Sequence, residues 1–281
     1  MQNIISASSK VTRALATATK RPMEIDEWSN IQSIEADNIL FERDRKKMKS
    51  SISVGSHKLL TLVNERFKTK LPNNSKNIVI EDINVKYLKV NIKINELAEI
   101  LGKKDDKNFR KELRYYLLEL RRLEVTGEEK VKGKIINWKN GAFISSAEIK
   151  NNSIEIILSP QYAQSIADSP YTQYPREVFN IDNRNDNAYK IALKLSEYYH
   201  MKNNISNGRN NKIKVKNVIE ITNLPTIEAV RTTKQGYENR IIKPFIKVLD
   251  SLIKDKIIKS YEITNTADYN EFMESYLIFE M

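Results

Sequence analysis

The chain has 281 residues, 40% of them hydrophobic, which is enough for the core of one large domain or of two ordinary ones. Its 47 basic and 36 acidic residues give a net charge of +11, which points to a polyanionic partner or an anionic surface. The absence of cysteine excludes disulfides, thiolate catalysis and cysteine zinc sites, and no apolar run reaches the roughly 20 residues that span a bilayer. We therefore expect a cytoplasmic protein with no membrane partner.

The N-terminal residues lack the patterns of an independent domain. Residues 1–22 are basic, contain no acid before Glu24 and lack the apolar segment of a secretory signal. They fit an unstructured arm better than a transit-like leader. Residues 24–50 contain Trp28 and end in the charged run FERDRKKMK, which suggests an amphipathic connector. We interpret residues 1–50 as a flexible N-terminal arm and connector.

Regular helical spacing begins at Ser56, which is placed to cap a helix that ends before Pro72. Residues 78–94 are rich in Ile, Val and Tyr and predict one or two strands. Asn95 can cap a short helix, ELAEILG, which Gly102 ends. After a loop, a longer helix is expected from about Phe109 to Leu123.

Three strand-like segments follow this helix: VKGKIINW, NGAFISSAEI and NNSIEIIL, and residues 159–167 can add a short helix. A helix, a short helix, a longer helix and a β-hairpin follow one another in a winged helix-turn-helix. The short and longer helices form the turn motif, and the hairpin is the wing.

The same order recurs in the second half of the chain. Residues 186–201 predict a helix, KIKVKNVIEIT a strand and the start of a helix, and residues 225–231 a short helix. The long helical tract is QGYENRIIKPFIKVLDSLIKDKII, and KSYEI with ESYLIFEM supplies the wing. A tract rich in Pro, Asn and Asp near residues 170–180 separates the halves. The predicted fold is α+β, with two tandem winged helix-turn-helix domains at residues 51–170 and 171–281.

The basic surplus is concentrated on the two predicted turn motifs. Residues 51–125 hold 16 basic and 10 acidic side chains, and residues 201–260 hold 13 and 5. Residues 126–170 are balanced at 5 and 5, and residues 261–281 hold no base and 5 acids. A lysine-rich composition inherited from an AT-rich genome would not be expected to concentrate the charge in this way.

The first long helix has one basic stripe opposite its leucine stripe. The members of this stripe are Lys107, Arg110, Lys111, Arg114 and Arg121. An ordinary solvated face mixes both signs, whereas the two acids of this helix, Glu112 and Glu119, lie off the stripe. We expect this helix to clamp the DNA backbone, with Arg110 and Arg114 as weaker candidates for base contacts.

The second long tract begins with a denser set of basic and polar residues. These residues are Arg231, Lys234, Gln235, Tyr237, Asn239, Arg240, Lys243 and Lys247. Lysines and arginines neutralise phosphates and release counterions, and Arg, Asn and Gln near a helix N-terminus can reach base edges in the major groove. We expect Gln235, Asn239 and Arg240 to read bases, while Tyr237 fits either a DNA contact or a core position.

Pro244 lies inside the helical pattern of this second tract. Proline removes a backbone donor and clashes with the preceding turn. It therefore predicts either a kink in one continuous helix or a new helix that starts at about Lys243.

Catalytic motifs are not found in the sequence. No G-x-x-x-x-G-K-[ST] loop is present, and the two histidines, His57 and His200, do not form a close ligand pair. The pairs Tyr115-Tyr116 and Tyr198-Tyr199 fall within helical patterns, where packing explains them better than nucleophilic catalysis. We expect no enzymatic activity, no cofactor and no metal.

Several segments carry a resemblance to the tandem winged-helix replication initiators of iteron-type plasmids. They are SHKLLTLVNERF, IKINELAEILG followed by FRKELRYYLLELRRLEV, FISSAEIKNNSIEIILSPQYAQSI, YKIALKLSEYYHM and GYENRIIKPFIKVLDSLIKD, within residues 50–265. The resemblance implies binding to directly repeated double-stranded origin sites, mainly through the second winged helix. It also implies a homodimer through the first domain that represses the protein's own gene. The implied partners are the host replication initiator and the replicative helicase. The N-terminal extension of about 50 residues and the Asn-rich wing depart from that family.

Two other functions remain open. The first is a winged-helix transcriptional regulator or phage replication organiser that binds DNA in the same way. A single palindromic DNA site would favour this alternative. The second is a nucleic-acid-processing enzyme with an unfamiliar site. The acidic pairs Asp105-Asp106 and Glu128-Glu129 fall in predicted loops, where solvated turns explain them better than metal ligands do.

Overall fold

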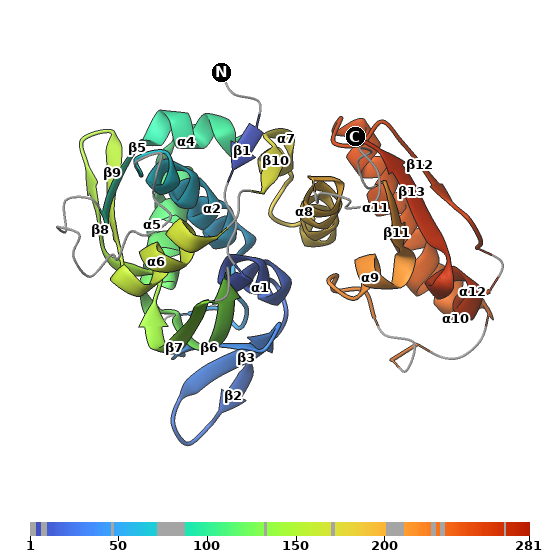
Figure 1. Cartoon of the computed structure of the whole chain (residues 1–281), viewed down its shortest axis with the longest axis horizontal. Coiled ribbons are helices and arrows are strands. Elements are labelled where there is room, and N and C mark those ends of the chain that lie inside the picture. The colour runs from blue at the N-terminus through green and yellow to red at the C-terminus, as the bar shows by residue number, and fades with distance from the viewer. Residues whose placement is uncertain are drawn as a thin grey trace. The chain divides into compact units, whose positions relative to one another are not determined.

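A computed structural model describes residues 4–6, 10–45, 48–71, 88–131, 134–169, 172–200, 211–225, 229–230, 234–266 and 268–281. The protein is a mixed α+β chain with several small antiparallel sheets (Figure 1). It divides into two compact units, a first unit of residues 5–172 and a second unit that holds residues 173–281. Each unit is described by itself.

The N-terminal residues are folded. After a short strand, β1 (Ile4–Ser6), helix α1 (Lys10–Ala18) packs against α2 and β3, with Val11 and Leu15 fully buried. The expectation that residues 1–22 are unstructured is therefore wrong for α1. The small and aliphatic side chains of this helix recur at helical spacing, and the rest of the first unit covers them.

A five-stranded antiparallel sheet joins two distant segments of the first unit. Its strands are β2 (Glu24–Asp26), β3 (Ile31–Ala36), β4 (Ile39–Asp44), β6 (Glu124–Val131) and β7 (Lys134–Ala142), in the order β2-β3-β4-β6-β7. Gly127 makes the junction between β4 and β6 possible, because a Cβ there would lie 2.8 Å from the carbonyl oxygen of Asn38. The connector expected at residues 24–50 is thus largely a set of sheet strands.

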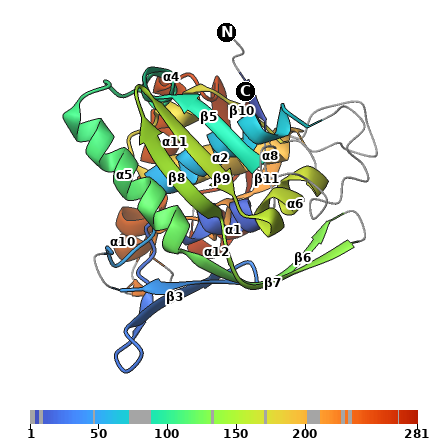
Figure 2. The ribbon, with the colours of Figure 1, turned by 90° about the vertical axis from the view of Figure 1, so that its left-hand side faces the viewer.

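The rest of the first unit has a winged-helix-like order. Its elements are α2 (Val54–Lys68), β5 (Lys89–Lys93), α4 (Ile94–Ile100), α5 (Lys107–Arg122), β8 (Ile144–Lys150), β9 (Ser153–Leu158) and α6 (Pro160–Asp168). The three strands form a sheet in the order β5-β9-β8. The sheet lies beside α5 and α2 in Figure 2. Most of the strand tract expected at residues 78–94 lies outside the described residues, and its last part is β5.

The predicted helix boundaries differ from the structure at two caps. Ser53, not Ser56, caps α2 and accepts a hydrogen bond from the Gly55 amide at 3.1 Å. Asn95 lies inside α4, which begins after Lys93 without a side-chain cap. Gly102 does end α4, with a φ of 62° in the left-handed region that favours glycine.

The second unit repeats this order. It contains β10 (Gln173–Pro175), α7 (Glu177–Asn180), α8 (Asp186–His200), β11 (Lys212–Lys214), α9 (Val215–Ile219), α10 (Lys234–Tyr237), the π-helical turn η4 (Glu238–Ile242), α11 (Lys243–Lys254), β12 (Ser260–Ile263), α12 (Tyr269–Glu274) and β13 (Tyr276–Glu280). Its sheet order is β11-β13-β12. Most of the short helix expected at residues 225–231 lies outside the described residues.

The two three-stranded sheets share one topology. In each, the strand that precedes the short helix pairs with the second strand of the hairpin, as β5 does with β9 and β11 with β13. Each unit therefore presents a helix, a strand, a short helix, a basic helix and a hairpin in the same order. Within the described residues, no helix is long and apolar enough to cross a membrane.

Candidate nucleic-acid interface

Helix α5 separates its apolar and basic side chains cleanly. Asp106 caps it by accepting a hydrogen bond from the Phe109 amide at 2.8 Å, a contact that typically stabilises a helix by about 1 kcal/mol. The residues that face the interior are Phe109, Leu113, Tyr116, Leu117 and Leu120. On the opposite side, Lys107, Lys111, Arg114 and Arg121 are exposed, as the spacing predicts.

Arg110 differs from the other members of the basic stripe. Its guanidinium donates to both carboxylate oxygens of Asp105, at 2.7 and 2.8 Å, and to Oδ1 of Asn152 at 3.1 Å. These bonds raise the pKa of Arg110, since Asp105 favours the charged form. Asn152 lies in the turn between β8 and β9, so Arg110 joins α5 to the hairpin. This makes Arg110 a weaker candidate for base contacts than its spacing suggests.

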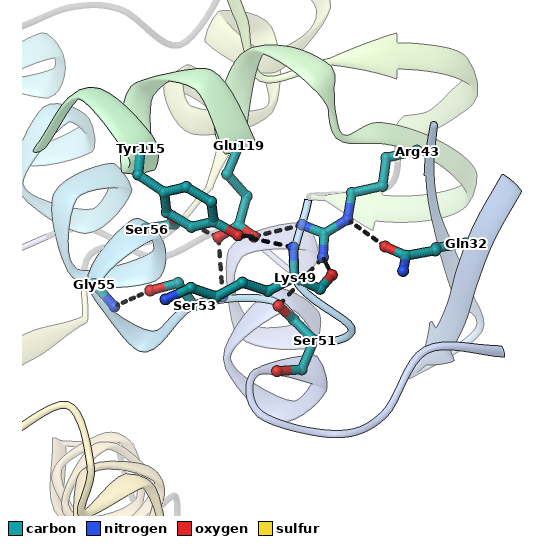
Figure 3. A network of polar contacts seen from close by, with 9 residues as sticks. All are labelled: Gln32, Arg43, Lys49, Ser51, Ser53, Gly55, Ser56, Tyr115 and Glu119. Atoms are coloured by element: carbon teal, nitrogen blue, oxygen red, sulfur yellow. Dashed lines mark hydrogen bonds and ion pairs between the residues drawn. The ribbon is translucent and has the colours of Figure 1, made fainter. Parts of the chain in front are cut away.

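A buried ion pair fixes α5 from the inside. Arg43 of β4 and Glu119 of α5 form this pair, and both side chains are fully buried (Figure 3). The other Glu119 oxygen accepts from the Ser53 amide at 2.9 Å and from the Ser56 hydroxyl at 2.7 Å. The carboxylate therefore bonds to three separate parts of the chain: β4, the N-cap of α2 and the first turn of α2.

The Arg43 end of the pair is equally well satisfied. Its Nε donates to Oε1 of Gln32 at 3.3 Å, and its Nη2 donates to the carbonyl oxygens of Lys49 and Ser51, at 2.7 and 3.2 Å. A buried ion pair is stable only when its remaining hydrogen-bonding positions are filled in this way. The network holds the N-terminal sheet and residues 49–53 against the basic helix.

Tyr115 closes the network on its solvent side, with its hydroxyl donating to Glu119 at 3.2 Å. Burial raises the pKa of Tyr115 to about 12, and the nearby carboxylate of Glu119 adds to the rise. The phenol stays protonated at neutral pH, so it can donate this bond. Its neighbour Tyr116 is buried, in line with the packing role expected for the pair.

The second basic tract is one helical run with a π-helical turn before Pro244. The Lys243 amide bonds to the Glu238 carbonyl oxygen, five residues earlier, whereas an α-helix bonds four residues back. Proline at the second position of α11 offers no amide for a regular bond. The wider turn accommodates this loss, so the helix is continuous and does not begin at Lys243.

Most of the described polar residues of this tract are exposed. Asn239, Arg240, Lys243 and Lys247 are exposed, while Ile241, Ile242, Phe245, Leu249 and Leu252 face the interior. Lys243 lies 3.1 Å from Glu238 and donates to Oδ1 of Asn239 at 3.0 Å. This bond occupies one of the two acceptor positions of the Asn239 amide oxygen.

The remaining candidates in the second unit are placed less directly for DNA. The ring of Tyr237 packs edge-on against that of Tyr269, with centroids 5.9 Å apart, which favours the packing alternative. The backbone of Lys234 and Gln235 belongs to α10, and Arg231 lies outside the described residues. Tyr261 of β12 donates to Asp250 of α11 at 2.7 Å, so a polar contact again joins the basic helix to the hairpin.

Comparison of the chain with solved structures gives a match for its fold. The fold resembles domains 2 and 3 of RctB. A crystal structure of the selenomethionine derivative of those domains aligns with a TM-score of 0.50 and 12% identity, over 96% of this chain and 95% of that one. A second crystal structure of RctB domains 2–3 aligns with a TM-score of 0.47 and 11% identity over the same shares. No protein-family model and no curated protein matches the chain.

The likeness to RctB extends to the N-terminal part of the first unit. Because it covers 96% of the chain, it must include most of residues 10–44. Sequence reasoning missed the contribution of this segment and of Glu119. One signal was present: Glu119 is next to Leu120 at the border of the apolar stripe, where a carboxylate needs a buried partner.

Proposed function

We propose that the chain is a sequence-specific, double-stranded DNA-binding replication initiator, built from two winged helix-turn-helix domains. One observation carries the proposal. In both units the same order of elements places a helix with an exposed basic face, α5 in one and α10 to α11 in the other, before a hairpin. In winged-helix proteins the helix at this position enters the major groove.

The two helices are suited to different tasks. The exposed stripe of α5 consists of Lys and Arg, which neutralise phosphates regardless of sequence. The second helix adds Asn239 to Arg240, and Asn and Arg side chains are able to distinguish adenine and guanine in the major groove. We therefore assign backbone clamping to α5 and base reading to Asn239 and Arg240, with Lys243 and Lys247 on phosphates.

The likeness to domains 2 and 3 of RctB supports the fold on which this proposal rests. The resemblance of several segments to iteron-type plasmid initiators supports the function. On this proposal the protein acts in the cytoplasm, binds directly repeated origin sites, and recruits the host initiator and replicative helicase. It needs no catalysis of its own, and a homodimer through the first domain represses its own gene.

Residues 51–170 and 171–281 are the two DNA-binding domains in this proposal. The N-terminal helix and strands then form an addition to the first domain. They stabilise α5 through Arg43.

The experiment that tests this function is a footprint on DNA beside the protein's own gene. An initiator protects several regularly spaced direct repeats. A winged-helix transcriptional regulator, the main alternative, protects a single palindrome. No protection at any salt concentration contradicts both.

Point variants test the assignment of residues. Arg240→Ala and Lys243→Ala should each weaken binding to the protected duplex by roughly tenfold, because charged contacts to bases and phosphates are each worth about 1–3 kcal/mol. Lys243→Ala should also reduce the slope of log affinity against log salt by about 1. Lys194→Ala removes one charge from α8 and is the matched control. Unchanged affinity in both test variants, or binding that does not depend on salt, overturns the assignment.

A further inference from the structure

Lys49 belongs to the segment between β4 and α2, outside the winged-helix elements, yet it packs on the basic helix α5. Its ammonium group lies 4.9 Å from the centroid of the Tyr115 ring, which is within the range of a cation–π contact. Its backbone amide donates to the Tyr115 hydroxyl at 3.4 Å. In Figure 3 the Lys49 side chain lies alongside the Tyr115 ring at the edge of the buried network. The N-terminal addition therefore places a cation against α5.

The backbone of Lys49 is held by the buried ion pair. Its carbonyl oxygen accepts a hydrogen bond from Nη2 of Arg43 at 2.7 Å, and the same nitrogen donates to the carbonyl oxygen of Ser51 at 3.2 Å. Because Arg43 is fully buried and paired with Glu119 of α5, these bonds fix the position of Lys49 relative to that helix. Such fixing in advance reduces the entropy that is lost when the ammonium group binds an anion.

The ring of Tyr115 borders the basic stripe of α5. Lys111 precedes Tyr115 by four residues and Arg114 precedes it by one, and both basic side chains are exposed. Residues four apart on a helix are neighbours on its surface. A cation above the Tyr115 ring therefore widens the basic stripe toward the segment that precedes α2. Helical spacing alone does not reveal this, because Lys49 is not part of the helix.

The charge of Lys49 is available for a partner outside the chain. Lys49 is exposed, and it takes part in no ion pair among the residues that the structure describes. Arg110 differs in this respect, since Asp105 already holds its guanidinium. An aromatic ring attracts a cation without neutralising its charge. Tyr115 thus orients the ammonium group and leaves its full charge for an anion.

We propose that Lys49 is a further DNA contact, which binds a backbone phosphate beside the phosphates that α5 contacts. This inference rests on the proposed function and deepens it, because the contact comes from the N-terminal addition and not from a winged-helix element. An ammonium group neutralises a phosphate and releases a counterion whatever the base sequence is. The addition then serves DNA binding directly, as well as through the stability that it gives to α5.

The salt dependence of binding to the protected duplex is the first arm of the test. Lys49→Gln should lower the slope of log affinity against log salt by about 1 and weaken binding by roughly fivefold at moderate salt. Lys49→Arg keeps the charge and should keep both quantities at their wild-type values. Lys194→Gln removes one charge from α8 in the second unit and should leave the slope unchanged.

Urea denaturation separates this contact from a packing role. The side chain of Lys49 is exposed, and the bond from Arg43 goes to its backbone, which every substitution retains. Lys49→Gln should therefore unfold at the same urea concentration as the wild-type protein. A variant that loses stability but keeps the wild-type salt slope would assign Lys49 to packing alone and overturn the proposal.

A chemical tether locates residue 49 on the DNA. The chain contains no cysteine, so Lys49→Cys provides a single thiol for an iron chelate that cleaves nearby DNA backbone. Arg114→Cys on α5 and Lys194→Cys on α8 carry the same label as positive and negative controls. Cuts from position 49 should border or overlap those from position 114, and position 194 should give none.

The outcomes distinguish this contact from the proposed function. A wild-type chain that binds no duplex contradicts the proposed function, and the Lys49 contact with it. If Arg114→Ala lowers the salt slope and Lys49→Gln does not, the Lys49 contact is overturned while the function stands. Cuts from position 49 that lie far from those of position 114, or no cuts at all, overturn it equally.

Discussion

Glu119 gives α5 a structural role in addition to its exposed basic face. The basic side chains of this helix face solvent, while Glu119 faces inward to Arg43 and to the N-terminal end of α2. A charged pair with all its hydrogen bonds filled tolerates little movement, because any shift leaves a buried charge unsatisfied. The pair therefore sets the height and rotation at which α5 presents its lysines and arginines.

Neutralising one member of this pair should be costly. Glu119→Gln keeps the shape of the side chain but leaves the Arg43 charge buried alone, and we expect a loss of about 3–5 kcal/mol in urea denaturation. Replacing both, Arg43→Met with Glu119→Leu, should recover only part of the loss: no charge stays buried, but the Ser53 amide and the Ser56 hydroxyl lose their acceptor. The exposed Glu112→Gln on the same helix should change stability by less than about 0.5 kcal/mol. A double variant as unstable as the single one would contradict this explanation.

The members of the basic stripe of α5 have different surroundings. Arg114 is exposed, whereas the guanidinium of Arg110 is held by Asp105 and Asn152. Because its charge is already paired with Asp105, Arg110 gains less from a phosphate contact. The stripe that spacing predicts is thus present, but one of its charges is already neutralised within the unit.

We therefore expect Arg114→Ala to weaken DNA binding more than Arg110→Ala. The Arg114 variant should lower the slope of log affinity against log salt by about 1, and the Arg110 variant by clearly less. Titration of a labelled duplex at several salt concentrations measures both quantities. Equal slopes for the two variants would show that the ion pair with Asp105 does not weaken the contribution of Arg110 to phosphate binding.

Helical spacing in the sequence was sufficient to predict the position of α5, α6 and α8 and the exposed face of α5. The cap of α2 was misplaced because the Ser56 hydroxyl is taken by Glu119, a contact 63 residues away. The same limit applies to the N-terminal strands. Their pairing with β6 and β7 is a long-range contact, and a short strand such as β2 has no buried residue to give an alternating pattern.

The second basic tract shows another limit of sequence reasoning. Pro244 indicated an irregular turn, but a kink, a new helix and a π turn all remove the same hydrogen bond. Likewise, Asp105 precedes α5 in a loop, where spacing rules for helices do not link it to Arg110.

The first unit is assembled from both ends of its chain segment. The strands of residues 24–44 meet those of residues 124–142, and Phe41 and Leu15 are fully buried in the result. The N-terminal segment is a structural part of this unit.

Removing residues 1–44 should therefore unfold or loosen the first unit. We expect binding of a hydrophobic dye to rise and the main thermal transition to fall, because Arg43 and the fully buried Phe41 and Leu15 are lost. The control variant Arg13→Gln lowers the charge of α1 but keeps the helix in the chain. It should leave the main thermal transition unchanged. A truncated chain that melts like the full one would restore the view of this segment as a flexible arm.

The π turn before Pro244 changes how the second basic helix must be counted. A π turn inserts roughly one extra residue into the helix. A helical wheel drawn with regular α-helical spacing therefore misplaces the residues before the turn by about 100° relative to those of α11. Asn239 and Arg240 thus point elsewhere than such a wheel suggests. Any redesign of the DNA specificity of this helix should index positions separately on either side of Glu238–Ile242.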